Sequence, residues 1–137
     1  MKSFLEYLQT PSLILGGETK ESLAVRAEDF LCAESVGNYV KVIYRSATDG
    51  KMVTKLIRTS MKRVEEAVSS CPYIIRCHHA FLVNLQKVKE IYGNLQGYLL
   101  RLDGLKLRVP VSRAYAKRVT ELIYGVTRVT QNYPQWT

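Results

Sequence analysis

Residues 39–58 read YVKVIYRSATDGKMVTKLIR, and this stretch decides the fold class. Its two halves, 39–45 and 51–58, are rich in the β-branched and aromatic residues that are typical of strands. Between them lies Asp49-Gly50, a strong short-range signal for a hairpin turn. The stretch therefore predicts two antiparallel strands joined by a tight turn.

The rest of the chain contains more strand candidates of the same kind. A second hairpin is predicted around Asp103-Gly104, which again lies between two apolar runs. Its two strands are residues 98–102 and 106–110, the further candidates are 22–25, 30–34 and 88–92, and RCHHAFLVN at 76–84 also ends in a strand-like apolar run. With eight or more short strands, the chain is predicted to be mainly β with a few short helices.

Two segments carry a helical pattern instead. In TSMKRVEEAVSS, Thr59 and Ser60 are candidate caps and Pro72 follows as a stop. In SRAYAKRVTELI, Ser112 is the candidate N-cap, and Arg113 falls in the first turn. Apolar residues recur at helical spacing in both segments, and the predicted buried positions are Met61, Val64, Val68, Tyr115, Val119, Leu122 and Ile123.

A length of 137 residues suits one domain with its own core. Residues 21–125 are predicted to form it, with 1–20 as a linker or the tail of a longer parent and 126–137 as a C-terminal tail. The three cysteines are odd in number and lack C-x-x-C spacing, which favours neither disulfides nor a zinc site. Because no apolar window is long enough for a membrane span, a cytoplasmic protein is expected, linked to a membrane only through a missing upstream segment.

Positive charge concentrates in the second half of the chain. The formal net charge is +8, and residues 73–118 contribute +7 of it, whereas residues 1–40 carry −3. A one-sided basic surface attracts polyanions over a distance, so nucleic acid or an anionic membrane is the leading class of partner. A basic face that serves only solubility would show a more even spread.

Residues 76–84, RCHHAFLVN, place two adjacent histidines in this basic region. Neighbouring residues of a strand point to opposite faces, so His78 and His79 are expected to point apart, which disfavours a shared metal. Nothing marks a nucleophile with its base, so no metal, cofactor or enzymatic activity is predicted. Core packing accounts for one histidine but poorly for the adjacent Arg76, whereas contact with nucleic acid accounts for all three residues.

Three stretches, in this order, carry a family resemblance. GNYVKV at 37–42, IRCHHAFLVNLQKVKEI at 75–91 and VPVSRAYAKRV at 109–119 resemble the LytTR family, the DNA-binding domain of LytR/AgrA-type bacterial transcription regulators. The resemblance implies short antiparallel sheets flanked by helices. It also implies that loops, rather than a recognition helix, enter successive major grooves of DNA.

The resemblance also implies which residues contact DNA. His79 and Arg113 stand at base-contacting positions, and Arg76 with His78 stands at a basic pair. These roles fit the chemistry, because arginine can pair bidentately with guanine while lysine mainly neutralises phosphates. The predicted DNA-binding residues are Asn38, Tyr39, Lys41, Arg76, His78, His79, Ser112, Arg113 and Lys117. Ala80 departs from the family, where many members carry a serine.

A sequence-specific double-stranded DNA-binding transcription regulator of the bacterial response-regulator type is therefore expected. It is expected to act as an effector domain of a two-component system or as a stand-alone regulator, to bind direct repeats as a homodimer, and to have no small-molecule substrate. Two alternatives stay open. An RNA-binding β module would stack bases on Tyr39, Tyr92 or Tyr98, and a protein-interaction domain would bind polyanions without sequence preference.

Overall fold

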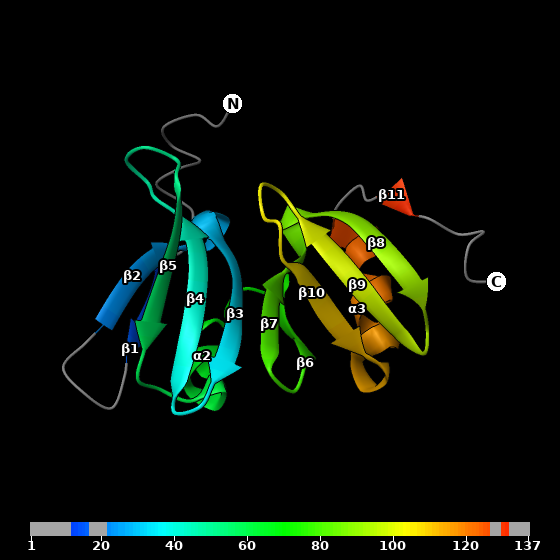
Figure 1. Cartoon of the computed structure of the whole chain (residues 1–137), viewed down its shortest axis with the longest axis horizontal. Helices are drawn as coiled ribbons and strands as arrows, with labels where there is room; N and C mark the ends of the chain where they lie inside the picture. Colours follow the sequence, from blue (N-terminus) through cyan, green and yellow to red (C-terminus); the bar gives the residue numbers. More distant parts are fainter. Residues whose placement is uncertain (1–11, 17–21, 127–129, 132–137) are drawn as a thin grey trace.

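Strands make up most of the structure, and helices pack against them (Figure 1). The computed structural model describes residues 12–16, 22–126 and 130–131. The strands are β1 (Ser12–Gly16), β2 (Ser22–Arg26), β3 (Phe30–Val36), β4 (Tyr39–Arg45), β5 (Met52–Ile57), β6 (Ile74–His78), β7 (Phe81–Asn84), β8 (Val88–Asn94), β9 (Gly97–Leu102), β10 (Arg108–Ser112) and β11 (Thr130–Gln131). The helices are α2 (Met61–Ala67) and α3 (Arg113–Val126), with 3-10 turns η1 (Ala27–Asp29) and η2 (Leu85–Lys87).

The described strands form three sheets. The largest has the order β5-β4-β3-β7-β6, the second has the order β10-β9-β8-β11, and the third is the β1–β2 hairpin. Every pairing is antiparallel except that of β11 with β8. The predicted mainly β fold, with short antiparallel sheets flanked by helices, is confirmed.

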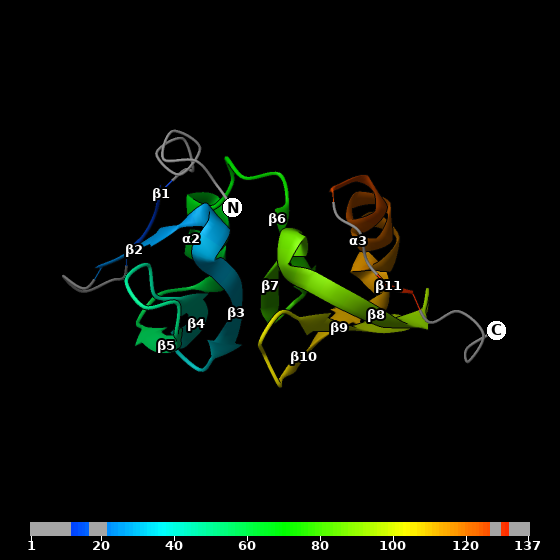
Figure 2. The ribbon, with the colours of Figure 1, turned by 90° about the horizontal axis from the view of Figure 1, so that it is seen from above.

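The five-stranded sheet has a hydrophobic cluster on each face. Leu82 packs with Leu13 of β1 and Val64 of α2. Its neighbours Phe81 and Val83 pack instead with the second sheet and α3. This division follows from the strand's two-residue period, which sends successive side chains to opposite faces. Seen from above, β6 and β7 lie between the half of the molecule with α2 and the half with α3 (Figure 2).

Both predicted hairpins form. Residues 39–45 coincide with β4, and β5 pairs with it along its length from Met52 to Ile57. The turn closes where Asp49 Oδ1 accepts from the Lys51 N–H at 3.0 Å and Gly50 takes a φ of 69°. The second hairpin joins β9 to β10 through a loop in which Gly104 has a φ of 76°. Such positive φ angles cost glycine little.

Both predicted helices form with the expected burial. Ser60 caps α2, since its side chain accepts from the Arg63 N–H at 3.2 Å. Of the residues predicted to be buried, Met61, Val64, Val68, Val119 and Ile123 are buried. Tyr115 and Leu122 are half-buried and pack against the hydrophobic cluster that contains Val119 and Ile123. Helix α3 begins at Arg113, directly after Ser112 ends β10.

Strand β1 lies within the stretch predicted as a linker or tail. Its Leu13 and Leu15 are each only 1% exposed, because pairing with β2 brings them onto the core. At the other end, α3 runs to Val126, and β11 lies in the stretch predicted as a C-terminal tail. Within the described ranges, no helix has both the length and the apolar character to cross a membrane.

Candidate nucleic-acid interface

The two histidines lie at the tip of the β6–β7 hairpin. Strand β6 ends at His78, the chain turns through His79 and Ala80, and β7 begins at Phe81. The expectation that the two imidazoles point to opposite faces is wrong, because the chain reverses where a continuous strand was assumed. Their ring centroids are 4.3 Å apart, and the ring of His78 also meets Phe81 edge-on at 5.8 Å.

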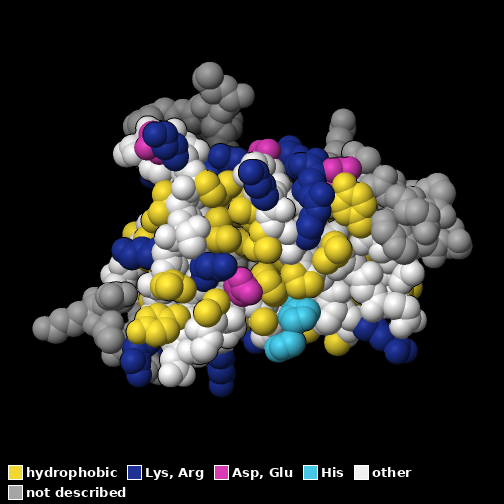
Figure 3. Space-filling view, in the orientation of Figure 1, with side chains coloured by type: hydrophobic (Ala, Val, Ile, Leu, Met, Phe, Trp, Pro, Cys, Tyr) yellow, Lys and Arg dark blue, Asp and Glu magenta, His cyan; other side chains and the backbone are white. Residues whose placement is uncertain are grey.

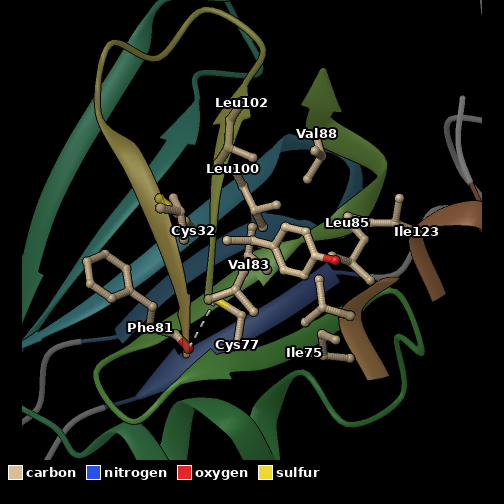
Figure 4. Packing of buried hydrophobic residues seen from close by; sticks show 14 of the residues in the cluster. Cys32, Ile75, Cys77, Phe81, Val83, Leu85, Val88, Leu100, Leu102 and Ile123 are labelled. Atoms are coloured by element: carbon tan, nitrogen blue, oxygen red, sulfur yellow. Dashed lines mark hydrogen bonds between the residues drawn. The ribbon is translucent and has the colours of Figure 1, made fainter. Parts of the chain in front are cut away.

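Cys77 forms a bulge just before this turn. The register pairs Arg76 with Leu82 and His78 with Phe81, which leaves Cys77 as the extra residue of β6. Its thiol is buried among the labelled apolar side chains of Figure 4 and donates to the carbonyls of Phe81 at 3.8 Å and Pro110 at 3.5 Å. Burial raises the pKa of the Cys77 thiol to about 12, so it is a protonated core group rather than a nucleophile.

Hydrogen bonds fix the shape of the turn. The Ala80 N–H donates to His78 Nδ1 at 3.1 Å, which leaves Nε2 to carry the proton of the neutral ring. Burial, and then the charge of His79, lower the pKa of His78, so the neutral form prevails near pH 7. The Ala80 carbonyl in turn accepts from the Ser35 N–H at 2.8 Å. This turn of His78, His79 and Ala80, the histidine turn, is thereby bonded to β3 in the middle of the sheet.

The β3–β4 turn lies at the same end of the sheet. Val36 pairs with Tyr39, so Gly37, which has a φ of 60°, and Asn38 form the turn. Asn38 is exposed, and Tyr39 is 41% exposed. Because Ser35, one residue from the end of β3, bonds to Ala80, the loop that carries the predicted residues Asn38 and Tyr39 is a neighbour of the histidine turn.

A row of side chains crosses the sheet behind these two turns. The register aligns Leu56, Lys41, Glu34, Phe81 and His78 on successive strands. Within the row, Lys41 Nζ lies 3.2 Å from Glu34 Oε1. This partly exposed pair is worth little to stability, but it holds the ammonium group of Lys41 against the sheet.

The remaining predicted residues, Ser112, Arg113 and Lys117, lie at the junction of β10 and α3. Ser112 ends the strand, and Arg113 and Lys117 are exposed on the first turns of the helix. The bond from Cys77 to Pro110 connects β10 with β6. In Figure 1 this junction and both turns lie along the lower edge, and Figure 3 shows the histidines there with basic side chains on either side.

The side chain of Arg76 differs from those of the other predicted residues in bonding to both a helix and the histidine turn. Nη1 donates to Glu65 Oε1 of α2 at 3.0 Å, and Nη2 donates to the carbonyl of His79 at 2.8 Å. The guanidinium therefore connects α2 to the histidine turn. Sequence reasoning missed Glu65, since nothing in the periodicity of a helix indicates which strand residue its carboxylate will meet.

The structure also bears on the alternative chemistries. Tyr98 is only 9% exposed in the core, and Tyr92 lies under Arg108, whose Cζ is 5.5 Å from the ring centroid. The expectation that Tyr98 could stack on an RNA base is therefore wrong, because its ring is buried. No cluster of three metal-ligating side chains occurs within the described ranges.

Comparisons with known proteins agree with this architecture. The family model of the LytTr DNA-binding domain matches residues 20–124. Transcriptional regulatory protein YpdB of Escherichia coli K12 is 39% identical over 66 residues, which is 44% of this chain and 26% of YpdB; the YpdB of Shigella flexneri matches equally. The match thus spans about a quarter of the length of these relatives. A solved LytTr DNA-binding domain from Bacillus cereus superposes with a TM-score of 0.60 and 25% identity, covering 82% of this chain and 98% of that one.

Proposed function

The chain belongs to the LytTR family of DNA-binding domains, and on this basis we propose that it is a sequence-specific transcription regulator that reads double-stranded DNA through loops. The name of the YpdB relatives, transcriptional regulatory protein, supports the regulatory role. We further propose that it is either the effector domain of a bacterial response regulator or a stand-alone regulator of the same type. Its basic second half supplies the attraction to DNA that such a role needs.

The observation that carries the proposal is the placement of three predicted groups along one edge. The histidine turn is bonded to β3, and the bond between Cys77 and Pro110 ties β6 to the strand that leads into α3. Base-reading groups must be held to a fraction of an ångström, which rigid elements do better than free loops. The major groove, about 12 Å wide, admits a two-stranded β-ribbon such as the β6–β7 tip.

Each group has a proposed role that follows from its chemistry. The His79 ring at the tip contacts a base edge, with the Nε2–H of His78 as a second donor. Arg113 pairs bidentately with guanine, since its guanidinium is exposed and has no ion pair within the described residues. Lys117 neutralises phosphate. The loop residues Asn38, Tyr39 and Lys41 approach the neighbouring groove, with Ser112 placing the start of α3.

Selection from random double-stranded DNA at near-physiological salt tests the proposal. The wild type is run beside a His79→Ala, Arg113→Ala double variant, and beside a variant of the exposed Arg63 of α2 as a control for charge. We expect the wild type and the Arg63→Ala control to recover a repeated motif, as a homodimer on direct repeats requires, and the double variant to lose it.

Two results would overturn the assignment. Recovery of the same motif by the double variant would remove His79 and Arg113 from base readout. If the wild type recovers no motif and its binding disappears as salt is raised, the basic surface is only electrostatic, and an RNA or protein partner takes its place.

A further inference from the structure

A hollow of about 310 Å³ lies between α2, β6 and α3. In Figure 2 the two helices lie on either side of β6. Its apolar wall includes Pro72 and Ile75. Its polar wall is rich in hydrogen-bond donors, from Arg76, Arg118 and Tyr115. Glu65 is the carboxylate on the lining.

Several of these donors have no partner. Within the described part of the chain, Arg118 and the Tyr115 hydroxyl make neither a hydrogen bond nor an ion pair, and Ser69 at the same hollow has no side-chain bond. The buried Nε of Arg76 is also unpaired. Glu65 Oε1 already accepts from Nη1 of Arg76. The buried Nε of Arg76 and the free guanidinium of Arg118 thus lie on one hollow, and an acceptor bound there would pair with both.

We propose that this hollow is a binding site for an oxyanion, a phosphate or carboxylate group. Two guanidinium groups against one carboxylate leave the lining with a net positive charge. Arginine forms short, charge-assisted and often bidentate bonds to such groups. The volume lies at the small end of ligand pockets, about 300–1,000 Å³, so an anion with a small organic body fits, its apolar part on Pro72 and Ile75.

An anion here also acts on the histidine turn. Arg76 lines the hollow and, through Nη2, holds the carbonyl of His79. An oxyanion competes with Glu65 for the same guanidinium and so changes the restraint on the turn. This effect on DNA reading rests on the proposed function, whereas anion binding itself does not.

The oxyanion has two sources with the same chemistry. It is either a backbone phosphate of bound DNA or a free phosphate-bearing molecule. The first makes Arg118 part of the DNA footprint, and the second makes the hollow an effector site.

Phosphate titration followed by amide and arginine Nε NMR signals tests the site directly on DNA-free protein. Sodium phosphate replaces sodium chloride at constant ionic strength, with wild type, Arg118→Gln and Arg63→Gln compared. Arg63 is an exposed arginine of α2 outside the hollow, so its variant makes the same charge change. We expect saturable shifts at Ser69, Arg76, Tyr115 and His79, with affinity at least tenfold weaker in Arg118→Gln and unchanged in Arg63→Gln. Shifts that do not saturate, or an equal loss in both variants, overturn the site.

Salt titrations of binding to random duplex DNA then identify the source. If DNA fills the hollow, Arg118→Gln reduces the salt slope by about one more than Arg63→Gln does. If a free molecule fills it, the two variants bind DNA alike without phosphate, and phosphate changes the cognate affinity of wild type but not of Arg118→Gln. Absence of sequence-specific binding by the wild type would remove the proposed function, while saturable phosphate shifts would still establish the anion site.

Discussion

The histidine turn and the start of α3 carry the two residues proposed to read bases, yet they are built in opposite ways. Three hydrogen bonds hold the turn, from Ala80 to His78, from Ser35 to Ala80, and from Arg76 to the carbonyl of His79. Arg113 instead projects an exposed side chain without an ion pair in the described structure. The backbone of the turn is already ordered and loses little conformational entropy on binding, while the long Arg113 side chain loses more. From this difference we infer that the turn fixes the position of the protein on DNA, and that the Arg113 side chain then adopts the conformation that its contact requires.

The largest effect is expected from damage beneath the turn. Asn84 is fully buried at the end of β7, donates to the carbonyls of Ala27 and Phe30, and accepts from the Gln86 N–H. Asn84→Ala removes all three bonds and leaves a cavity at a fully buried position, so we expect the free energy of unfolding to fall by about 3 kcal/mol. Urea denaturation measures it, with the exposed His79→Ala as the control, for which a change within about 0.5 kcal/mol is expected. Equal stabilities of the two variants would contradict a structural role for Asn84.

The next effect separates base reading from charge at the start of α3. Arg113→Ala is expected to cost about 1–3 kcal/mol on a cognate site and to relax base preference there, because a bidentate contact to guanine is lost. Lys117→Ala, one helical turn away, should weaken cognate and random DNA alike and reduce the salt slope by about one. Fluorescence anisotropy with both duplexes measures the losses. If both variants lose equally on both duplexes, Arg113 does not read bases.

A smaller effect tests whether Arg76 acts through its position. Glu65→Ala removes a negative charge, so random DNA should bind slightly more tightly. It also removes the partner that holds the Arg76 guanidinium near the His79 carbonyl, so cognate DNA should bind a few-fold more weakly, and Glu65→Gln should restore much of that loss. The two duplexes therefore move in opposite directions. If Glu65→Ala bound both cognate and random DNA more tightly, Glu65 would affect DNA binding only through its negative charge.

The smallest effect concerns acidification of the turn. Burial and the neighbouring His79 lower the pKa of His78 from its ordinary value of 6.5. His78 in the unfolded chain then binds its proton more tightly than in the folded chain. The contribution of neutral His78 to the free energy of unfolding is therefore complete above pH 6.5, and it is lost as the pH falls through the lowered pKa of the folded state. Protonation of Nδ1 also removes the acceptor for the Ala80 N–H.

The His78→Asn variant isolates this titration. An asparagine oxygen can accept from the N–H two residues on, and the amide does not titrate. The fall in melting temperature between about pH 7.5 and about pH 5.5 should therefore be smaller in the variant than in the wild type. Identical pH profiles would show that the stability does not depend on His78.

Local signals predicted well where the structure is local. The β4 strand begins and ends where its β-branched and aromatic run does, and Ser60 caps α2 as its position indicated. The β6–β7 reversal was missed because His79-Ala80 contains no glycine, proline, asparagine or aspartate to mark a turn. The turn needs none, since every positive φ among the described residues belongs to a glycine elsewhere. Strand β1 was missed because Leu13 and Leu15 acquire an inward face only by pairing with β2.

The sequence by itself determined the hairpins, the helices, the concentration of positive charge and the family of this chain. The hairpins, helices and charge depend on periodicity, turn chemistry and composition, which act between residues close in the chain, whereas the family followed from the resemblance of three short stretches. Only the tertiary structure decided that Arg76 meets Glu65, that the β3–β4 turn adjoins the histidine turn, and that Arg76 and Arg118 line one hollow. Such contacts depend on how β3 pairs with β7 and how α2 and α3 pack beside β6. No spacing within a single element records those arrangements, because they arise from burying two sides of one sheet at once.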